Sequence, residues 1–283
     1  MKTEILKDNK FTDGFKIRYP HHVENDDDNP QMIYKTSEAT PAWYISQWFS
    51  RDSLANGKIT NENKIINLED STKIVNIKNN KIYIEINGGK EYKKHRTSCE
   101  PWPHLLLEQF FSGKKLADCK SLKMILDFEY LKFVNHMEDG SDPTLHTAQF
   151  QWFLNFSNQN KNSKGYKDFF WFGLSFLDTP RYDFPPEFMA MDGGKEDATK
   201  KFIYIVDSHK YLDKPININD QVSISFEVLD LIKKGFGEAK KRGFLAETEF
   251  EDLGFNETNI GFEIPGTFDI GVKINEISLE ADL

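Results

Sequence analysis

The sequence predicts an all-β fold, an antiparallel β-sandwich with one short helix near residues 229–242. Short runs of alternating apolar and polar residues recur along the 283-residue chain, and clusters of Asn, Asp, Gly, Pro and Lys separate them. One segment alone has its apolar residues at helical spacing. Because we find no internal repeat and no break in composition, we expect a single β-sandwich domain over residues 41–283, with an irregular N-terminal segment, residues 1–40, packed on it.

The expected strands are the alternating runs, taken in order along the chain. They span residues 43–49, 73–78, 81–86, 104–110, 122–133, 147–157, 168–176, 202–206, 221–228, 260–264 and 268–280. The sequence NNKI at residues 79–82 is typical of a hairpin turn between two of these runs.

The segment 228–243 departs from the β pattern. Leu229, Ile232, Phe236 and Ala239 recur there at helical spacing, and lysines occupy the opposite side. We therefore expect an amphipathic helix against one edge of the sandwich.

The last run, residues 268–280, changes its apolar parity. Its apolar residues stand at even positions up to Ile274 and at odd positions at Ile277 and Leu279. One strand register cannot turn both sets toward the core. We therefore expect a β-bulge or bend near Asn275.

Composition and charge exclude several classes of protein. The net charge of −9 argues against a nucleic-acid partner, and no apolar run is long enough to span a membrane. The N-terminus lacks the apolar core of a signal peptide, so we expect a soluble chain, cytoplasmic as written and exported if a leader has been trimmed. Cys99 and Cys119 fit no zinc motif, and we expect two reduced, buried thiols.

The aromatic runs at 147–157 and 168–176 carry distinctive residues on both strand faces. In the first run, large apolar side chains share one parity, and the other parity carries mainly amides, namely Gln149, Gln151 and Asn155. In the second run, Trp171 shares a parity with a glycine and a serine, which leaves open space around its ring. Trp48 likewise stands opposite the apolar set of its own run.

Rings mixed with amides, hydroxyls and a few carboxylates match the chemistry of sugars. The C–H faces of a sugar stack on aromatic rings, and its hydroxyls pair with amides in a concave site. The sequence therefore predicts a glycan-binding face with Trp48, Gln149, Gln151, Asn155 and Trp171. Two alternatives stay open: an ordinary solvated sheet face, or a second core covered by another segment.

Two polar segments offer residues for catalysis or for contact with a sugar acid. Arg96, Glu100, Trp102 and His104 lie close together before and at the start of the run 104–110, where two prolines hold Trp102 stiffly. Arg96 and His104 would neutralise a sugar carboxylate, and Glu100 would accept a hydroxyl; a structural corner is the alternative.

The proline-rich loop 177–188 follows the second aromatic run. It carries Arg181 and Tyr182, which together with His209 would supply the base and the carboxylate clamp of a polysaccharide lyase. A well-packed loop without chemistry is the alternative.

Asp127 and Glu129 share one strand face, about 7 Å apart by strand rise. That separation fits the two carboxylates of a glycoside hydrolase, which lie about 5 to 10 Å apart. Ordinary solvent-facing charges are the alternative.

The sequence carries few motifs for metal binding or nucleotide chemistry. The acidic run 24–30, with Asp26 and Asp28, offers oxygen ligands for a structural calcium ion, although it lacks the order of residues in an EF-hand loop. His146 has the parity of the core residues, which predicts a hydrogen-bonded core histidine. Motifs of serine hydrolases, zincins and nucleotide enzymes are absent, and we expect no cofactor.

The strand pattern resembles that of the concanavalin-like jelly rolls, the β-sandwiches of lectins, carbohydrate-binding modules and some polysaccharide lyases. The resemblance covers about residues 40–283 and is carried by WYISQWF, FQWFLNF, FFWFGL and VKINEISLE. It implies a jelly-roll sandwich. The sequence RTSCE at 96–100 matches the alginate-lyase signature only loosely, so no lyase residues are carried over.

The sequence as a whole favours binding of an oligo- or polysaccharide. A polysaccharide lyase or a glycoside hydrolase acting in the same groove is one alternative. A non-catalytic structural or oligomer subunit, with its aromatic face buried by a partner, is the other.

Overall fold

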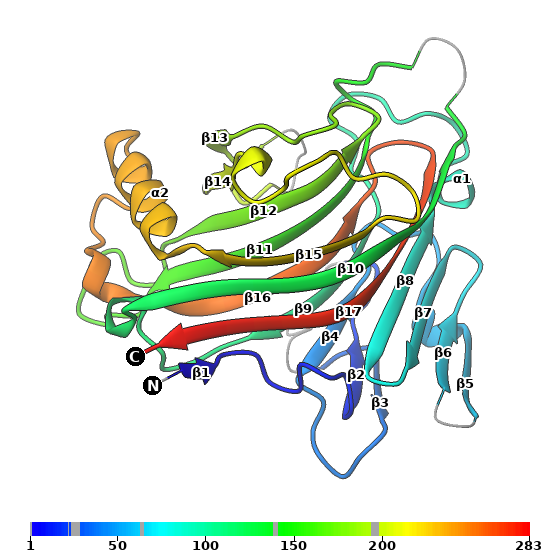
Figure 1. The fold of residues 1–283 in the computed structure, drawn as a ribbon, viewed down its shortest axis with the longest axis horizontal. Coiled ribbons are helices and arrows are strands. Elements are labelled where there is room, and N and C mark those ends of the chain that lie inside the picture. The colour runs from blue at the N-terminus through cyan, green and yellow to red at the C-terminus, as the bar shows by residue number, and fades with distance from the viewer. Residues whose placement is uncertain (1, 22, 24–28, 63–64, 138–140, 194–197) are drawn as a thin grey trace.

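The protein is a sandwich of two β-sheets, seen in a computed structural model that describes residues 2–21, 23, 29–62, 65–137, 141–193 and 198–283. The sheets lie face to face, and the chain termini lie near each other at one end (Figure 1). The predicted antiparallel β-sandwich is confirmed. Two of the described strand pairs, β2 with β4 and β12 with β14, are parallel.

Sheet A contains eight strands. Its order is β15 (Gln221–Glu227), β10 (Ser121–Asn135), β17 (Phe268–Asp282), β8 (Lys81–Asn87), β7 (Lys73–Lys78), β6 (Ile65–Glu69) and β5 (Lys58–Glu62), and β1 (Lys2–Glu4) pairs with β17.

Sheet B contains nine strands. Its order is β13 (Phe188–Met191), β14 (Phe202–Val206), β12 (Phe169–Thr179), β11 (Ala148–Asn158), β16 (Leu253–Glu263), β9 (His104–Phe110), β4 (Trp43–Ser46), β2 (Gly14–Ile17) and β3 (Met32–Lys35).

The core lies between the two sheets and is rich in phenylalanine. Phe128 of sheet A packs against Phe150 and Phe176 of sheet B, with ring centroids 5.0 and 5.4 Å apart. All three rings are at most 1% exposed. Because alternate residues of each strand fill this layer, the remaining residues of sheet B must point away from sheet A, onto its outer face.

The predicted helix is confirmed as α2 (Leu229–Lys241), which covers one end of the sandwich (Figure 1). Leu229, Ile232, Phe236 and Ala239 are all buried, as their spacing predicted. The other helices are short: α1 (Gly88–Glu91) and the 3₁₀ turns Leu54–Asn56, Leu116–Asp118, Ser208–Lys210 and Phe250–Asp252.

The predicted bulge in β17 is also confirmed. Asp127 of β10 pairs with Glu276, and the next residue, Phe128, pairs with Ile274. Asn275 is therefore the extra residue, and it allows both Ile274 and Ile277 to face the core.

The N-terminal segment is more regular than predicted. Residues 1–40 were expected to be irregular, yet they contribute β1, β2 and β3. β1 pairs with β17, and β2 pairs with both β3 and β4. Strands β5, β6 and β13 were not predicted either. These strands are three to five residues long, too short for a clear alternation, and pairing with neighbouring strands specifies them.

Strand β16 is longer than the predicted strand 260–264, because it begins at Leu253. Polar residues in its first half interrupt the apolar alternation, so the sequence did not predict that half as a strand. Thr258 is one of them, and its hydroxyl accepts a hydrogen bond of 2.8 Å from the buried indole of Trp152.

The prediction of two buried thiols is half wrong. Cys119 is buried, but Cys99 is exposed in the loop before β9. None of the helices in the described part of the chain combines the length and hydropathy of a membrane span.

Candidate functional site

The outer face of sheet B carries two adjacent rows of side chains that cross several strands. In the first row, paired residues of β4, β9, β16, β11 and β12 are Tyr44, Glu108, Asn259, Phe153 and Gly173. In the second, paired residues of β9, β16, β11, β12 and β14 are Phe110, Glu257, Asn155, Trp171 and Ile203. Rings and carboxylates thus meet on one surface.

This surface is hollowed into a groove of about 330 Å³. Its aromatic lining includes Trp48, Trp102, Phe110, Phe153 and Trp171, and its charged or titratable lining includes Arg18, His104, Glu108, Asp192, Glu257 and Glu263. The groove therefore combines flat apolar surfaces with a predominance of carboxylates.

The ring of Phe153 takes the space that the sequence left open beside Trp171. A Cβ atom at Gly173 would lie 2.4 Å from this ring, so only glycine lets the phenyl group lie across β12. Phe153 and Trp171 are in edge-to-face contact, with centroids 6.1 Å apart. The prediction of open space around Trp171 is therefore wrong, because the Phe153 ring fills that space and widens the aromatic surface.

Glu108 is an anchored carboxylate of the groove. The Arg18 guanidinium donates to it at 3.1 Å, and the Ser46 hydroxyl and the Trp48 indole also donate to it. Burial raises the pKa of the Glu108 carboxyl, and these three donors oppose that effect. Arg18 in turn stacks on the Trp48 ring, 4.7 Å from its centroid, which holds both side chains in place.

Glu257 lies beside Glu108 on the neighbouring strand. Glu108 pairs directly with Asn259, and Glu257 is two residues away on β16 and faces the same side. Such diagonal neighbours are separated by about 7 to 8 Å. From this backbone separation the two carboxyls can reach the spacing of about 5 to 10 Å that general-acid and nucleophile or base roles require in glycoside hydrolysis.

Glu263 fixes the aromatic rim near the start of β9. It accepts a hydrogen bond of 2.7 Å from the indole of Trp102 and lies 3.2 Å from His104 Nε2. The rings of Trp102 and His104 are stacked, with centroids 6.2 Å apart. A carboxylate from β16 therefore orients a tryptophan that stands before β9.

The structure brings some of the predicted residues into the groove. Trp48, Trp102, His104 and Trp171 line it. The amides lie on the predicted face but are mostly covered: Gln151 is 7% exposed and Asn155 is 2% exposed. Gln151 donates to the Ser175 hydroxyl at 3.3 Å, and Gln149 is half-buried outside the groove lining.

Of the two predicted catalytic segments, the first contributes Trp102 and His104 to the groove lining, whereas Arg96, Glu100, Arg181 and Tyr182 lie outside it. Arg96 stacks on the far side of Trp102, 4.6 Å from its ring, and is hydrogen-bonded to carbonyl groups, while Glu100 accepts the Thr97 amide. Arg181 stacks on the exposed Tyr182 at 4.8 Å. These contacts are those of packed loops, so the structure does not assemble the lyase set of base and clamp.

Asp127 and Glu129 were predicted as a carboxylate pair in the groove, and this prediction is wrong. They lie on β10, in the outer face of the opposite sheet. Asp127 accepts two hydrogen bonds of 2.9 Å from Gln221, and Glu129 pairs with Lys273 at 2.8 Å. Strand alternation placed them on one face correctly, but it does not say which sheet that face belongs to.

The calcium candidates Asp26 and Asp28 lie outside the described residues. The described part of the chain holds no group of three or more His, Cys, Asp or Glu side chains placed to bind a metal ion. His146 is buried, as predicted, and both ring nitrogens are hydrogen-bonded, Nε2 at 2.7 Å to the Arg96 carbonyl.

Sequence reasoning missed Arg18, Glu108, Glu257 and Glu263. Part of the signal was present, since Glu257, Asn259 and Glu263 share one parity within FNETNIGFE, opposite Ile260 and Phe262. Extending the predicted strand to residue 253 would have exposed this acidic face.

No protein-family model and no curated protein matches the chain. Among solved structures, it is similar to the endoglucanase Cel12A of Rhodothermus marinus, with 10% identity over 77% of this chain and 91% of that one and a TM-score of 0.43.

Two further solved structures belong to the same comparison. The match to the family 12 xyloglucanase of Bacillus licheniformis has 11% identity, covers 80% of this chain and 97% of that one, and has a TM-score of 0.43. The family 11 xylanase of Neocallimastix patriciarum has 10% identity, covers 77% and 91%, and has a TM-score of 0.37. The assignment of function therefore depends on the groove's own residues.

Proposed function

We propose that the groove on sheet B binds an oligo- or polysaccharide chain. The observation that supports this most is the combination of partly exposed tryptophans, Trp48, Trp102 and Trp171, with fixed carboxylates in one elongated hollow. Pyranose rings stack on indole faces, and anchored carboxylates accept their hydroxyls. A solvated sheet face would not need Glu108 to be held by three donors.

Titration of tryptophan fluorescence with cellotetraose, xylotetraose and tetragalacturonate tests this proposal. A neutral tetrasaccharide is expected to quench or shift the emission, and Trp171→Ala should weaken its binding about tenfold, since one stacking contact contributes about 1 kcal/mol or more. Tyr182→Ala is the matched control, because it removes an exposed ring outside the groove. An equal loss in both variants, or no response to any sugar, would contradict the proposal.

Hydrolysis is the second candidate function, and the pair Glu108 and Glu257 favours it. The two carboxyls would divide between them the role of proton donor to the glycosidic oxygen and the role of nucleophile at the anomeric carbon or base for water. The exocyclic C–O bond breaks, and water supplies the new hydroxyl of one product and the proton of the other.

Release of reducing ends separates hydrolysis from binding. If the chain is a hydrolase, Glu108→Gln and Glu257→Gln should each abolish product formation while the same oligosaccharide still quenches fluorescence. A wild-type protein that binds a neutral oligosaccharide but releases no product over a day would leave binding as the function and remove the catalytic role of the pair.

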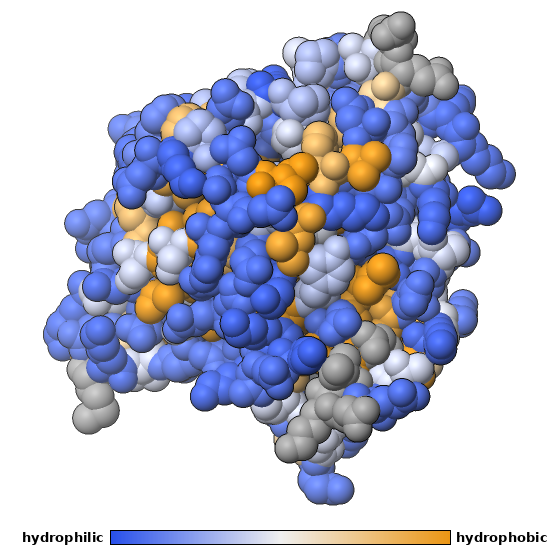
Figure 2. All heavy atoms as spheres, turned by 45° about the vertical axis from the view of Figure 1, so that its right-hand side comes forward, coloured by the Kyte–Doolittle hydropathy of each residue, from blue (hydrophilic) through white to orange (hydrophobic). Residues whose placement is uncertain are grey.

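The lyase and scaffold alternatives have less support. In the part of the chain that the structure describes, no tyrosine lines the groove beside His104, and Arg18 is already paired with Glu108. On the face shown in Figure 2, apolar side chains lie in separate groups among hydrophilic ones.

A further inference from the structure

The aromatic surface of the groove continues beyond its lining. Trp171 contacts Phe153 on one side and Phe169 on the other, with centroids 6.1 and 6.0 Å apart. The ammonium group of Lys201 lies over the Phe169 ring, 5.4 Å from its centroid. A ladder of three rings thus leads from the middle of the groove to a lysine.

Lys201 belongs to a second pocket, of about 540 Å³, which we call the lysine pocket. Among the described residues, four lysines line it, Lys164, Lys167, Lys200 and Lys201, against two carboxylates, Asp168 and Glu247. Lys201 is paired with Asp168 at 2.6 Å. The other three lysines are exposed, so the lysine pocket has an excess of positive charge that is open to a ligand.

The loops of the lysine pocket are held in defined conformations. Lys167 and Lys200 have positive φ angles of 71° and 58°, which lysine rarely adopts. The Lys167 amide donates to the Asn158 carbonyl at 2.8 Å, and the Asn158 side chain donates to Thr248 at 3.0 Å. The pocket is therefore built on fixed backbone, which lowers the entropy lost on binding a ligand.

The charge of the groove has the opposite sign. Glu108, Asp192, Glu257 and Glu263 line it, and Arg18 is the one arginine or lysine among its described lining residues. A polymer with a carboxylate on every sugar would meet repulsion there. Past Trp171 the lysines of the described lining begin, and an anionic group is favourable there.

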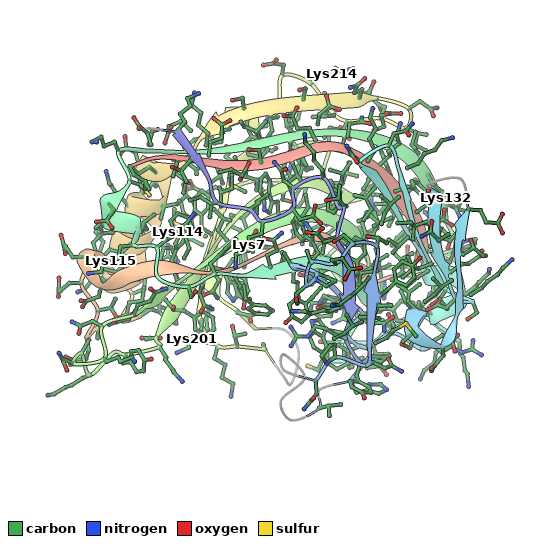
Figure 3. The ribbon with its side chains drawn as sticks, turned by 90° about the horizontal axis from the view of Figure 1, so that it is seen from below. Lys7, Lys114, Lys115, Lys132, Lys201 and Lys214 are labelled. Carbon is green, nitrogen blue, oxygen red and sulfur yellow. The ribbon has the colours of Figure 1, made fainter. Side chains whose placement is uncertain are left out.

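We propose that the lysine pocket binds an anionic group, a carboxylate or a sulfate, attached to a glycan whose neutral chain lies in the groove. This inference rests on the proposed function of the groove and specifies its substrate class. Lys201 stands two residues from Ile203, which pairs with Trp171, so the anionic group would lie about 7 Å along the strands from the stacked sugar. Figure 3 shows Lys201 on the side of sheet B that faces away from sheet A.

Calorimetric titration with matched oligosaccharides tests the inference. Xylotetraose carrying one glucuronate side group should bind about tenfold more tightly than plain xylotetraose, and tetragalacturonate should bind more weakly than either. The preference should disappear in Lys164→Gln/Lys200→Gln and in about 0.5 M salt, which screens exposed charges. Lys78→Gln/Lys81→Gln is the control, because it removes the same charge from an exposed hairpin of sheet A.

Each outcome decides between the two proposals. Equal binding of the charged and plain xylotetraose to the wild type, or a preference that survives in the pocket variant, overturns the role of the lysine pocket and leaves groove binding intact. If neither xylotetraose nor cellotetraose binds, the proposed function of the groove fails. The lysine pocket is then tested with inorganic sulfate alone. Binding of millimolar sulfate that Lys164→Gln/Lys200→Gln abolishes supports the pocket, and a lack of sulfate binding overturns it.

Discussion

At the scale of single residues, the buried ion pair of Arg18 and Glu108 is central to the groove. The two side chains are 10% and 11% exposed, and Ser46 and Trp48 complete the contacts of the carboxyl. A buried pair of this kind adds little net stability compared with apolar residues, but loss of one member leaves the other charge buried and unpaired.

Arg18→Met should therefore lower the free energy of unfolding by about 3 kcal/mol. The double variant Arg18→Met/Glu108→Gln should recover most of that loss, because it removes the unpaired charge as well. Urea unfolding at neutral pH measures both values. Equal stability of the single and double variants would show that the carboxylate is not desolvated in the folded protein.

Asp178 provides a test of pH dependence outside the proposed chemistry. It is 7% exposed, burial raises the pKa of its carboxyl, and its Oδ1 has no hydrogen-bond partner among the described residues. Since the folded-state pKa lies above the unfolded one, the stability that Asp178 contributes is complete below the unfolded pKa and is lost as the pH rises through the folded pKa.

The wild type should consequently lose stability relative to Asp178→Asn as the pH rises from below the unfolded-state pKa of the carboxyl through its raised folded-state pKa. Urea unfolding of both proteins at a series of pH values gives this difference directly. A difference that stays constant with pH, or one that changes in the opposite direction, would contradict the direction of the shift.

At the scale of elements, the two glycines of helix α2 lie in different surroundings. A Cβ atom at Gly235 would lie 2.6 Å from the Tyr204 ring, whereas a Cβ atom at Gly237 would meet nothing within 4 Å. The first glycine permits close packing of the helix on β14, and the second only weakens the helix.

Gly237→Ala should stabilise the protein by about 1 kcal/mol, the difference in helix propensity. Gly235→Ala gains the same propensity but should be net destabilising by about 1 kcal/mol or more, because the tyrosine has to move. Thermal unfolding of the two variants makes the comparison within one helix. Stabilisation by both substitutions would contradict the tight contact with Tyr204.

Elements were predictable from the sequence where a local pattern was long enough. The amphipathic spacing of Leu229, Ile232 and Phe236 predicted α2, and the change of parity after Ile274 predicted the bulge at Asn275. The four-residue strands β2 and β3 carry no such pattern, and their neighbours in sheet B specify them.

At the scale of the whole molecule, the site depends on contacts between distant parts of the chain. Strand alternation placed Trp48 and Trp171 on the outer face, but Arg18, Glu108 and Glu257 come from the neighbourhood of β2, from β9 and from β16. Only the order of the strands in sheet B brings them together, and one sequence does not contain that order. For the same reason, Asp127 and Glu129 were placed in the wrong sheet.

A crystal structure of Glu257→Gln with cellotetraose or xylotetraose would show directly whether a glycan lies in the groove of sheet B. We expect a sugar stacked on Trp171, with hydroxyls within hydrogen-bond distance of the residues that line the groove. Sugar bound on the outer face of sheet A, or an empty groove at saturating oligosaccharide, would contradict it.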